Sequence, residues 1–253
     1  MNIFWFQRYD DFNFKDLSER CEDSGIFGIL FAYSFYQDDY FVKIANQIDL
    51  NKKIKYMVAI RPYTISAQYL SMILNSFKKI VGDRLLVNLI TGWIYDHEKK
   101  VGGIIGEIKD TSSNIERSNY LIEYVRSLES LNDDISNFYI SVTNDVVFRS
   151  VKNKKVIIPY SWFKVNRFNL VAEDTMIYMM PVIRKTQKDL DSIKDKSINP
   201  DIEYFTYDSF ILFLEELNRK KITNILLTEN ENHQERENIL DFVSYLTNKE
   251  ADK

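Results

Sequence analysis

Short apolar runs alternate along the chain with stretches in which apolar residues recur every three or four positions. Residues 56–60 (YMVAI) form a nearly all-apolar run that predicts a strand buried on both faces, and Pro62 ends it. A helix with one apolar face is predicted next, between Ser66 as its N-cap and Gly82 as its end. Residues 84–90 (RLLVNLI) then predict a second buried strand.

These three elements are joined by short connections, and a strand, a helix and a strand in this order form a right-handed βαβ unit of a parallel sheet. Ligand-binding groups in such sheets lie at the carboxyl ends of the strands. The pattern therefore predicts that Arg61, Asn88, Thr91 and Gly92 lie at or near a ligand-binding rim.

The same alternation extends over the rest of the chain. Further strands are expected at residues 2–6, 26–33, 138–142, 156–158, 176–183 and 222–227. Helices are expected at residues 16–24, 40–47, 115–129, 146–151, 187–194, 209–219 and 234–246. Residues 94–114 lack sustained periodicity, which predicts a long loop. Eight strands separated mostly by helices, without a Pro/Gly-rich linker, predict an α/β fold: a (β/α)8 TIM barrel with shortened insertions, in a single domain of residues 1–253.

Composition and charge narrow the function classes. The 33 basic and 37 acidic residues nearly balance, so no field would hold nucleic acid or an anionic membrane. No apolar stretch reaches the ~18 residues that a membrane helix needs, and the first residues lack the features of a signal peptide. Cys21 is the single cysteine and is expected to be a core residue. With two histidines in addition, no metal site is expected, and the cysteine usage agrees with a cytoplasmic protein.

Residues 58–92 also carry a family resemblance. They read VAIRP…ISAQYLSMILNSFKKIVGDRLLVNLITG, in which an apolar strand ends in Arg-Pro and is followed by a helix, Gly-x-Arg and Asn-x-x-Thr-Gly. This segment resembles the corresponding part of the bacterial luciferase-like flavin monooxygenases, and among them most closely the alkanesulfonate monooxygenases. The resemblance implies a barrel with reduced FMN, supplied by a separate flavin reductase, across the carboxyl ends of its strands.

The resemblance assigns residues of the central segment to the flavin. Asn88 and Thr91 match positions that approach the flavin ring, and Ala59 and Gly92 are expected beside the cofactor. Arg61 has two interpretations: a cation beside the flavin or the substrate, or a charge paired with a carboxylate below the rim.

The strand at residues 138–142 is implied to lead to the phosphate of FMN. Ser141, Thr143 and Asn144 stand where the family has a Gly-Gly-Ser-Ser-like turn, and their side chains and the start of the next helix can favour an anion. The alternative is that Thr143 or Asn144 caps that helix. The glycines of the family turn are absent.

Other positions depart from the alkanesulfonate monooxygenases. Gln37 stands at the position of their cysteine, Tyr178 and Met180 at the positions of an arginine and a histidine, and Asn230 at the position of a tyrosine. Without that arginine a sulfonate loses its bidentate cation, and without the histidine and tyrosine the expected proton donors are missing. Sulfonate cleavage by the arrangement of that family is therefore not expected.

The residues that remain predict an aromatic, amide-containing pocket that would take an apolar or planar substrate. Its candidate lining residues are Tyr33, Tyr36, Tyr95 and Tyr178, and the alternative for each of them is packing in the barrel wall. The candidate catalytic residues are Gln37 and His97, and the alternative for His97 is a solvated loop histidine. His233 lies in the polar run of residues 229–237 and is expected at the surface.

Two functional hypotheses follow. The first is a flavin-dependent monooxygenase that uses reduced FMN and O₂ on an unidentified small organic substrate, with homodimer formation implied by the resemblance. The second is a catalytically silent relative that binds a flavin or serves as a partner subunit, which the replaced residues favour.

Overall fold

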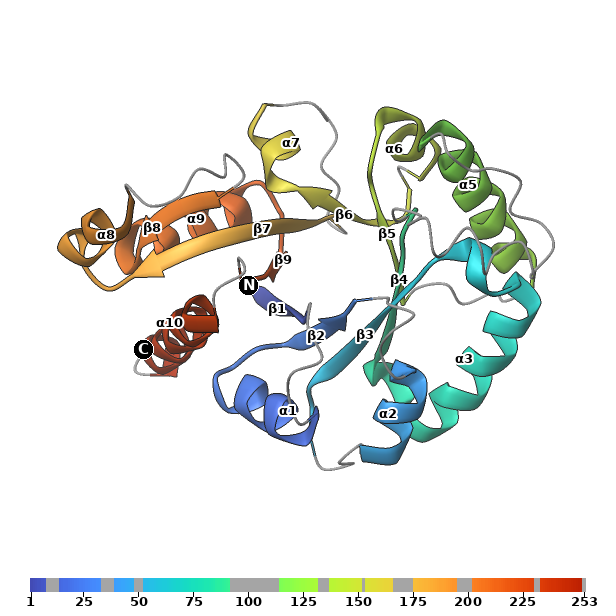
Figure 1. The fold of residues 1–253 in the computed structure, drawn as a ribbon, viewed down its shortest axis with the longest axis horizontal. Coiled ribbons are helices and arrows are strands. Elements are labelled where there is room, and N and C mark those ends of the chain that lie inside the picture. Colours follow the sequence, from blue (N-terminus) through green and yellow to red (C-terminus); the bar gives the residue numbers. More distant parts are fainter. Residues whose placement is uncertain are drawn as a thin grey trace. The chain divides into compact units, whose positions relative to one another are not determined.

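Strands and helices alternate along the chain in its structure, a computed structural model (Figure 1). The structure describes residues 1–7, 14–32, 39–47, 52–91, 114–131, 137–151, 153–165, 175–194, 202–229 and 233–251. The strands are β1 (Asn2–Gln7), β2 (Gly28–Phe31), β3 (Lys55–Ile60), β4 (Leu85–Leu89), β5 (Phe138–Ser141), β6 (Lys155–Pro159), β7 (Thr175–Arg184), β8 (Ile202–Thr206) and β9 (Asn224–Leu227). The helices are α1 (Phe14–Asp23), α2 (Tyr40–Gln47), α3 (Ala67–Val81), α5 (Asn114–Leu131), α6 (Asp145–Val151), α7 (Tyr160–Lys164), α8 (Gln187–Lys194), α9 (Tyr207–Arg219) and α10 (His233–Ala251), with the short 3-10 helices η1 (Pro62–Thr64) and η2 (Gly82–Arg84).

The strand pairing has the connectivity of a barrel. The strand order is β6-β5-β4-β3-β2-β1-β9-β7-β8, and β6 also pairs with β7. Strands β1 to β7 and β9 therefore form a cyclic order of eight, and the pairs whose register is described are parallel. This connectivity confirms the predicted (β/α)8 barrel.

Strand β8 is an addition that the sequence pattern did not predict. The predicted eighth strand is β9, and the sequence pattern predicts no helix or strand at residues 202–206. Strand β7 is ten residues long, and its first half pairs with β9 while Met180–Arg184 pairs with β8. The short segment of β8 is a strand because the extended end of β7 offers it a backbone partner, which a local pattern does not reveal.

The described residues fall into two compact units, which are described separately. One unit comprises residues 1–32, 49–56 and 158–253, and the other comprises residues 33–48 and 57–157. We call them unit 1 and unit 2.

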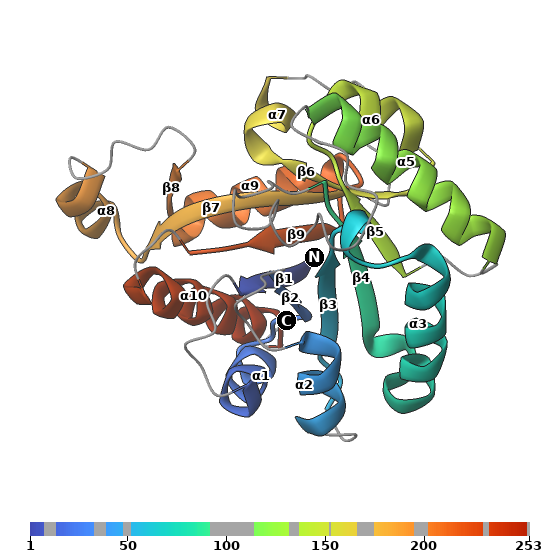
Figure 2. The same cartoon turned by 45° about the vertical axis from the view of Figure 1, so that its right-hand side comes forward.

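Unit 2 carries the central strand-helix-strand segment. Strand β4 is buried over its whole length and β3 over all but its first residue, as the apolar runs predict. Helix α3 begins and ends as the sequence predicts: the Ser66 side chain accepts a hydrogen bond from the Tyr69 backbone N–H, and Gly82 follows the helix at a positive φ of 61°. Each of the helices α2, α3, α5 and α6 contacts the next one in this order (Figure 2).

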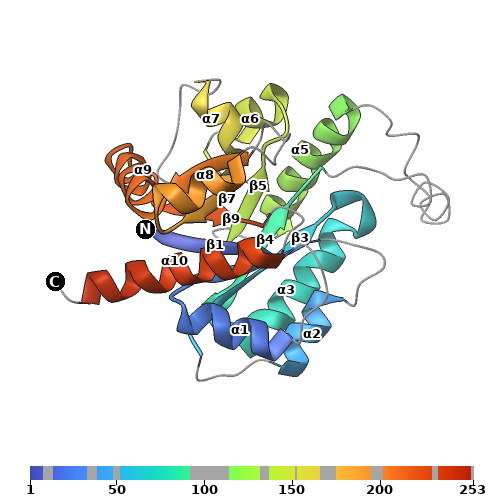
Figure 3. The same ribbon diagram turned by 60° about the vertical axis from the view of Figure 1, so that its left-hand side comes forward.

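Unit 1 contains the strands β1, β2, β7, β8 and β9. Helix α9 packs on β7 and β8, α10 packs on β7, and α10 lies beside α1 (Figure 3). An ion pair between Arg20 and Glu237 and a hydrogen bond from Thr247 Oγ1 to the Ser24 carbonyl (3.3 Å) join these two helices. The core of the helical layer is aromatic, with the Phe210 and Phe242 rings 5.0 Å apart.

Candidate functional site

Two polar side chains join the carboxyl ends of β4 and β5 in unit 2. Asn88 lies on β4 with 3% of its surface exposed, opposite Tyr139 of β5. Ser141, two residues further along β5, donates its hydroxyl proton to Asn88 Oδ1 over 2.9 Å. Since neighbouring residues on both strands are apolar, this bond satisfies a buried amide oxygen that would otherwise be costly.

A second polar pair follows directly after these strands. Thr91 Oγ1 donates to Thr143 Oγ1 over 3.2 Å, and Thr91 is 2% exposed. We call Asn88, Thr91, Ser141 and Thr143 the amide-hydroxyl cluster. The structure thus brings together four of the residues that the sequence predicts at the rim, and their side chains are neutral donors and acceptors, which suit a polar, planar ligand.

Asn144 caps the helix that follows. Its Oδ1 accepts a hydrogen bond from the Val147 backbone N–H (3.0 Å), and its Nδ2 donates to Ser118 Oγ (2.6 Å). Ser118, on α5, is completely buried. Of the two predicted roles for Asn144, helix capping is the one that its contacts show.

Ala59 and Arg61 lie at the carboxyl end of β3, with 4% and 6% of their surfaces exposed. The carbonyl group of Arg61 accepts hydrogen bonds from the backbone N–H (3.0 Å) and the hydroxyl (2.7 Å) of Thr64, which turn the chain into η1. The Ile90 backbone N–H donates to the Ile60 carbonyl (3.0 Å), so this strand end adjoins the end of β4. Arg61 is therefore a buried cation at the end of β3, and this strand end adjoins the end of β4, where Asn88 and Thr91 of the amide-hydroxyl cluster lie.

Tyr178 lies in unit 1, on β7, where it is half-buried and contacts the Phe6 ring edge-on at 5.9 Å. Met180, the second departure on this strand, pairs with Ile202 of β8. The other predicted residues lie outside the described part of the chain: Tyr33, Tyr36, Gln37, Gly92, Tyr95, His97 and Asn230.

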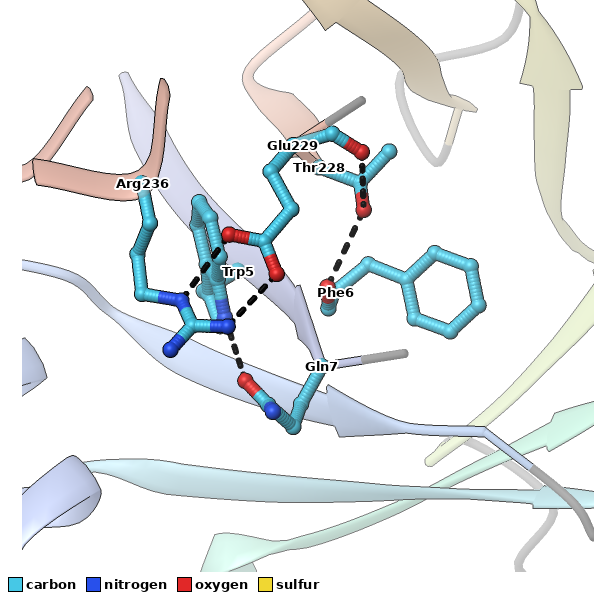
Figure 4. Close-up of polar contacts among 6 residues, drawn as sticks. All are labelled: Trp5, Phe6, Gln7, Thr228, Glu229 and Arg236. Atoms are coloured by element: carbon cyan, nitrogen blue, oxygen red, sulfur yellow. Dashed lines mark hydrogen bonds and ion pairs between the residues drawn. The ribbon is translucent and has the colours of Figure 1, made fainter. Parts of the chain in front are cut away.

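The strand ends of unit 1 carry a buried ion pair that the sequence pattern did not reveal (Figure 4). Arg236 of α10 donates from Nε to Glu229 Oε2 (3.0 Å) and from Nη2 to Glu229 Oε1 (2.6 Å), and both residues are at most 2% exposed. The guanidinium group lies 6.0 Å from the centre of the Trp5 ring, whose Nε1 donates to Gln7 Oε1 (3.0 Å). This bidentate geometry compensates the desolvation of both charges.

A second ion pair lies next to the first, and in this pair the arginine is on the strand and the carboxylate is on the helix. Arg184, the last residue of β7, donates two hydrogen bonds to Glu235, from Nη1 to Oε2 (2.8 Å) and from Nη2 to Oε1 (2.5 Å). The hydrogen bond to this carboxylate raises the pKa of Arg184 further above its ordinary value. The first turn of α10 is thus held to β7 and β9 by adjacent residues of opposite charge.

The structure also gives the environment of Cys21, and it bears on metal binding and on membrane-spanning helices. Burial raises the pKa of the completely buried Cys21 thiol to about 12, which keeps it protonated and agrees with its predicted place in the core. Within the described ranges, no group of three or more His, Cys, Asp or Glu side chains could hold a metal ion. Among the helices of this described part, none is both long and apolar enough to cross a bilayer.

No family model matches the chain. Solved structures do resemble it. A long-chain alkane monooxygenase matches 99% of this chain and 92% of its own at 10% identity, with a TM-score of 0.70. The F420-dependent tetrahydromethanopterin reductase of Methanopyrus kandleri matches 96% of this chain and 97% of its own at 11% identity, with a TM-score of 0.69.

A third similar structure contains a flavin. The oxygenating constituent of 3,6-diketocamphane monooxygenase from Pseudomonas putida, in complex with FMN, matches 96% of each chain at 10% identity, with a TM-score of 0.67. The structural neighbours are luciferase-like proteins, whereas the predicted link to alkanesulfonate monooxygenases stays a prediction. Sequence identities of 10–11% show a shared fold alone. The chain has the (β/α)8-barrel fold of the bacterial luciferase-like proteins.

Proposed function

We propose that the chain is a member of the luciferase-like family and a flavin-dependent monooxygenase, which uses reduced FMN as a co-substrate and oxidises a small organic molecule. The fold supports this, because monooxygenases resemble the chain over nearly their whole length and one of them is in complex with FMN. Fold alone does not carry function, so the residues must fit the cofactor as well.

The observation that carries the proposal is the amide-hydroxyl cluster. Four hydrogen-bonding side chains converge at the carboxyl ends of two otherwise apolar strands, where (β/α)8 barrels bind ligands. The isoalloxazine ring of FMN presents carbonyl and N–H groups at one edge, which the amide of Asn88 and the hydroxyl group of Thr91 can pair with. These residues fit a flavin.

The remaining residues are assigned in the same proposal. Ala59 and Gly92 would lie against the flavin, and Arg61 would supply a cation beside it. Ser141, Thr143 and Asn144 would meet the phosphate, although the contacts of Asn144 with Val147 and Ser118 already engage its side chain. Reduced FMN, when bound, would supply the electrons for oxygen activation, and the chain would position it and exclude water.

The substrate side of the proposal rests on residues outside the described ranges and on Tyr178. Gln37 and His97 would donate or accept protons and hydrogen bonds, and Tyr33, Tyr36, Tyr95 and Tyr178 would line the substrate pocket. The functional unit would be a single domain of residues 1–253, served by a separate flavin reductase and assembled as a homodimer.

A catalytically silent flavin-binding relative or partner subunit is the second candidate. The departures at Gln37, Tyr178, Met180 and Asn230 favour it, because each replaces a group that the alkanesulfonate monooxygenases use.

Anaerobic titration of the protein with reduced FMN tests the proposal. We expect Asn88→Leu to weaken binding about tenfold, as the loss of one hydrogen bond predicts. Asn224→Leu is the matched control, because Asn224 is a buried asparagine (9% exposed) at the opposite, amino end of β9. Absence of binding by the wild-type protein would reject the monooxygenase and the flavin-binding relative, and would leave only a partner subunit without a flavin. Binding without accelerated oxygen consumption would favour the silent relative.

A further inference from the structure

Three side chains of unit 1 form an aromatic and apolar surface toward the carboxyl ends of β1 and β7. Phe6 of β1 and Tyr178 of β7 meet edge-on, with ring centres 5.9 Å apart and an angle of 70° between the ring planes. Met180 follows Tyr178 by two positions on β7, so it faces the same side of that strand. All three side chains are half-buried, which leaves part of each accessible to a ligand.

These side chains lie on the inner face of the strands. Successive side chains of a strand point to opposite faces, and Figure 4 shows the Phe6 ring directed away from Trp5 and Arg236. Trp5 faces helix α10, because the Arg236 guanidinium group of that helix lies 6.0 Å from the centre of its ring. Helices cover the outside of a (β/α)8 barrel, so Phe6 and the Tyr178 ring that it contacts face the inside. We call Phe6, Tyr178 and Met180 the inner wall.

The inner wall carries no charge. Strand β9 lies between β1 and β7, and its Leu226 pairs with Tyr178, so an aliphatic side chain adjoins the rings on the same face. The two ion pairs of these strand ends are made with α10, on the outside of the strands. Exchange of such a pair for a ligand would leave an uncompensated charge, so the pairs keep the strand ends fixed. The Tyr178 hydroxyl is the hydrogen-bonding group of the inner wall.

We propose that the substrate of the flavin-dependent reaction is an uncharged aromatic molecule, whose ring packs against Phe6 and Tyr178. Aromatic pairs are stabilised beyond the burial of their apolar area, and the flexible thioether of Met180 can adapt to the shape of a ring. A sulfonate or carboxylate group would lose its hydration here, and none of the three wall residues is a cation that could replace it. This inference rests on the proposed function and deepens it, because it names the substrate class and adds Phe6 and Met180 as residues that determine specificity.

Equilibrium dialysis with two probes that share one ring system tests the charge of the substrate. 2-Naphthol is a phenol and stays uncharged at about pH 7, whereas naphthalene-2-sulfonate is an anion. Binding is measured anaerobically, with and without reduced FMN, at probe concentrations up to about 1 mM, because ligands of few atoms bind weakly. We expect naphthol to bind about tenfold or more tightly than the sulfonate. Equal or tighter binding of the sulfonate, or no binding of naphthol under either condition, would overturn the proposal.

A variant of the inner wall tests the aromatic contact. Phe6→Leu keeps an apolar side chain without the ring, and we expect it to weaken naphthol binding about two- to tenfold, as the loss of one aromatic pair predicts. Binding of 1-octanol, an uncharged aliphatic probe, should change less. Tyr178→Leu gives the same measurement at the second ring if Phe6→Leu does not fold, which urea denaturation shows.

Phe27→Leu is the matched control. The Phe27 ring is 37% exposed and meets the Phe4 ring edge-on at 5.3 Å, directly before the amino end of β2, so it is a similar aromatic pair at the opposite end of the strands. An equal loss of naphthol binding in Phe27→Leu, or equal losses for naphthol and octanol in Phe6→Leu, would contradict aromatic packing on the inner wall.

Binding of reduced FMN by the wild-type protein is measured in parallel, so that the two proposals fail separately. Flavin binding without naphthol binding would reject this substrate class and keep the flavin proposal. Naphthol binding that Phe6→Leu weakens, without flavin binding, would reject the flavin proposal and keep the inner wall as a binding site for uncharged aromatic molecules.

Discussion

Units 1 and 2 close the carboxyl ends of their strands with different chemistry. In unit 1, two arginine-carboxylate pairs, Glu229 with Arg236 and Arg184 with Glu235, join strand ends to the first turn of α10. In unit 2, the corresponding bonds are neutral, between Ser141 and Asn88 and between Thr91 and Thr143. Each set contains a residue that is 2% exposed, Glu229 in unit 1 and Thr91 in unit 2, but the two sets differ in charge.

This difference in charge indicates which strand ends can bind a ligand without a large loss of free energy. A buried charged pair cannot exchange its partner for a neutral ligand without leaving an uncompensated charge. A hydroxyl-amide bond can be exchanged for a bond to a ligand of similar polarity with little net change in free energy. We therefore expect the ion pairs of unit 1 to be rigid and structural, and the hydrogen bonds of unit 2 to be open to exchange with a polar ligand.

The largest effect is expected from breaking the Glu229–Arg236 pair. Arg236→Met leaves the Glu229 carboxylate buried without its guanidinium group, so we expect a loss of about 3–5 kcal/mol in the free energy of unfolding. Urea denaturation measures it. The double variant Glu229→Leu/Arg236→Met removes both charges and should be more stable than Arg236→Met alone. If the single variant lost less than the double variant, the pair would not have the structural role assigned to it.

The Arg184–Glu235 pair should give a smaller effect. The Arg184 side chain is 16% exposed and that of Glu235 is 5% exposed, so water can partly replace the lost partner. We expect Arg184→Met to cost about 1.5–3 kcal/mol, the range for hydrogen bonds to charged groups. The same urea experiment applies, and a cost above that of Arg236→Met would reverse the order that burial predicts.

The neutral bonds of unit 2 should matter less for stability than for ligand binding. Ser141→Ala removes the hydroxyl group that bonds to Asn88 Oδ1, and we expect a cost of about 1 kcal/mol in the free energy of unfolding. The cost should be read from urea denaturation without flavin. Ser141→Thr, which keeps the hydroxyl group, is the matched variant, and an equal loss in both would point to packing instead of the hydrogen bond.

The sequence predicts these two regions unequally well because their signals differ in range. The central segment of unit 2 carries local signals: an apolar run for β3, Ser66 as a cap and Gly82 as an end for α3, and a second apolar run for β4. Each depends on residues within a few positions, and the structure has each of them. Asn88 and Thr91 could be placed at strand ends for the same reason.

The elements that the sequence missed depend on partners far along the chain. Strand β8 pairs with the extended end of β7, and the residues near β8 in the sequence do not indicate that this partner is present. The run of residues 229–237 is polar throughout, yet Glu229, Glu235 and Arg236 in it are almost completely buried. Polarity indicates exposure only when no partner compensates the charge, and the partners here lie on different elements.

The smallest change in the free energy of unfolding is expected at an exposed ion pair. Lys220 Nζ lies 2.8 Å from Glu216 Oε1 at the end of α9, with both side chains half exposed. The hydrogen bond from Lys220 lowers the pKa of Glu216, so the stabilisation is present above the ordinary carboxylate pKa and is lost as the pH falls through the lowered value. We expect Lys220→Ala to cost about 0.3–0.5 kcal/mol at pH 7 and nothing once Glu216 is protonated, because solvent screens the pair. Urea denaturation of both proteins at the two pH values measures it, and a cost that persists in acid would have to come from packing of the Lys220 side chain, which also lies over the Phe163 ring.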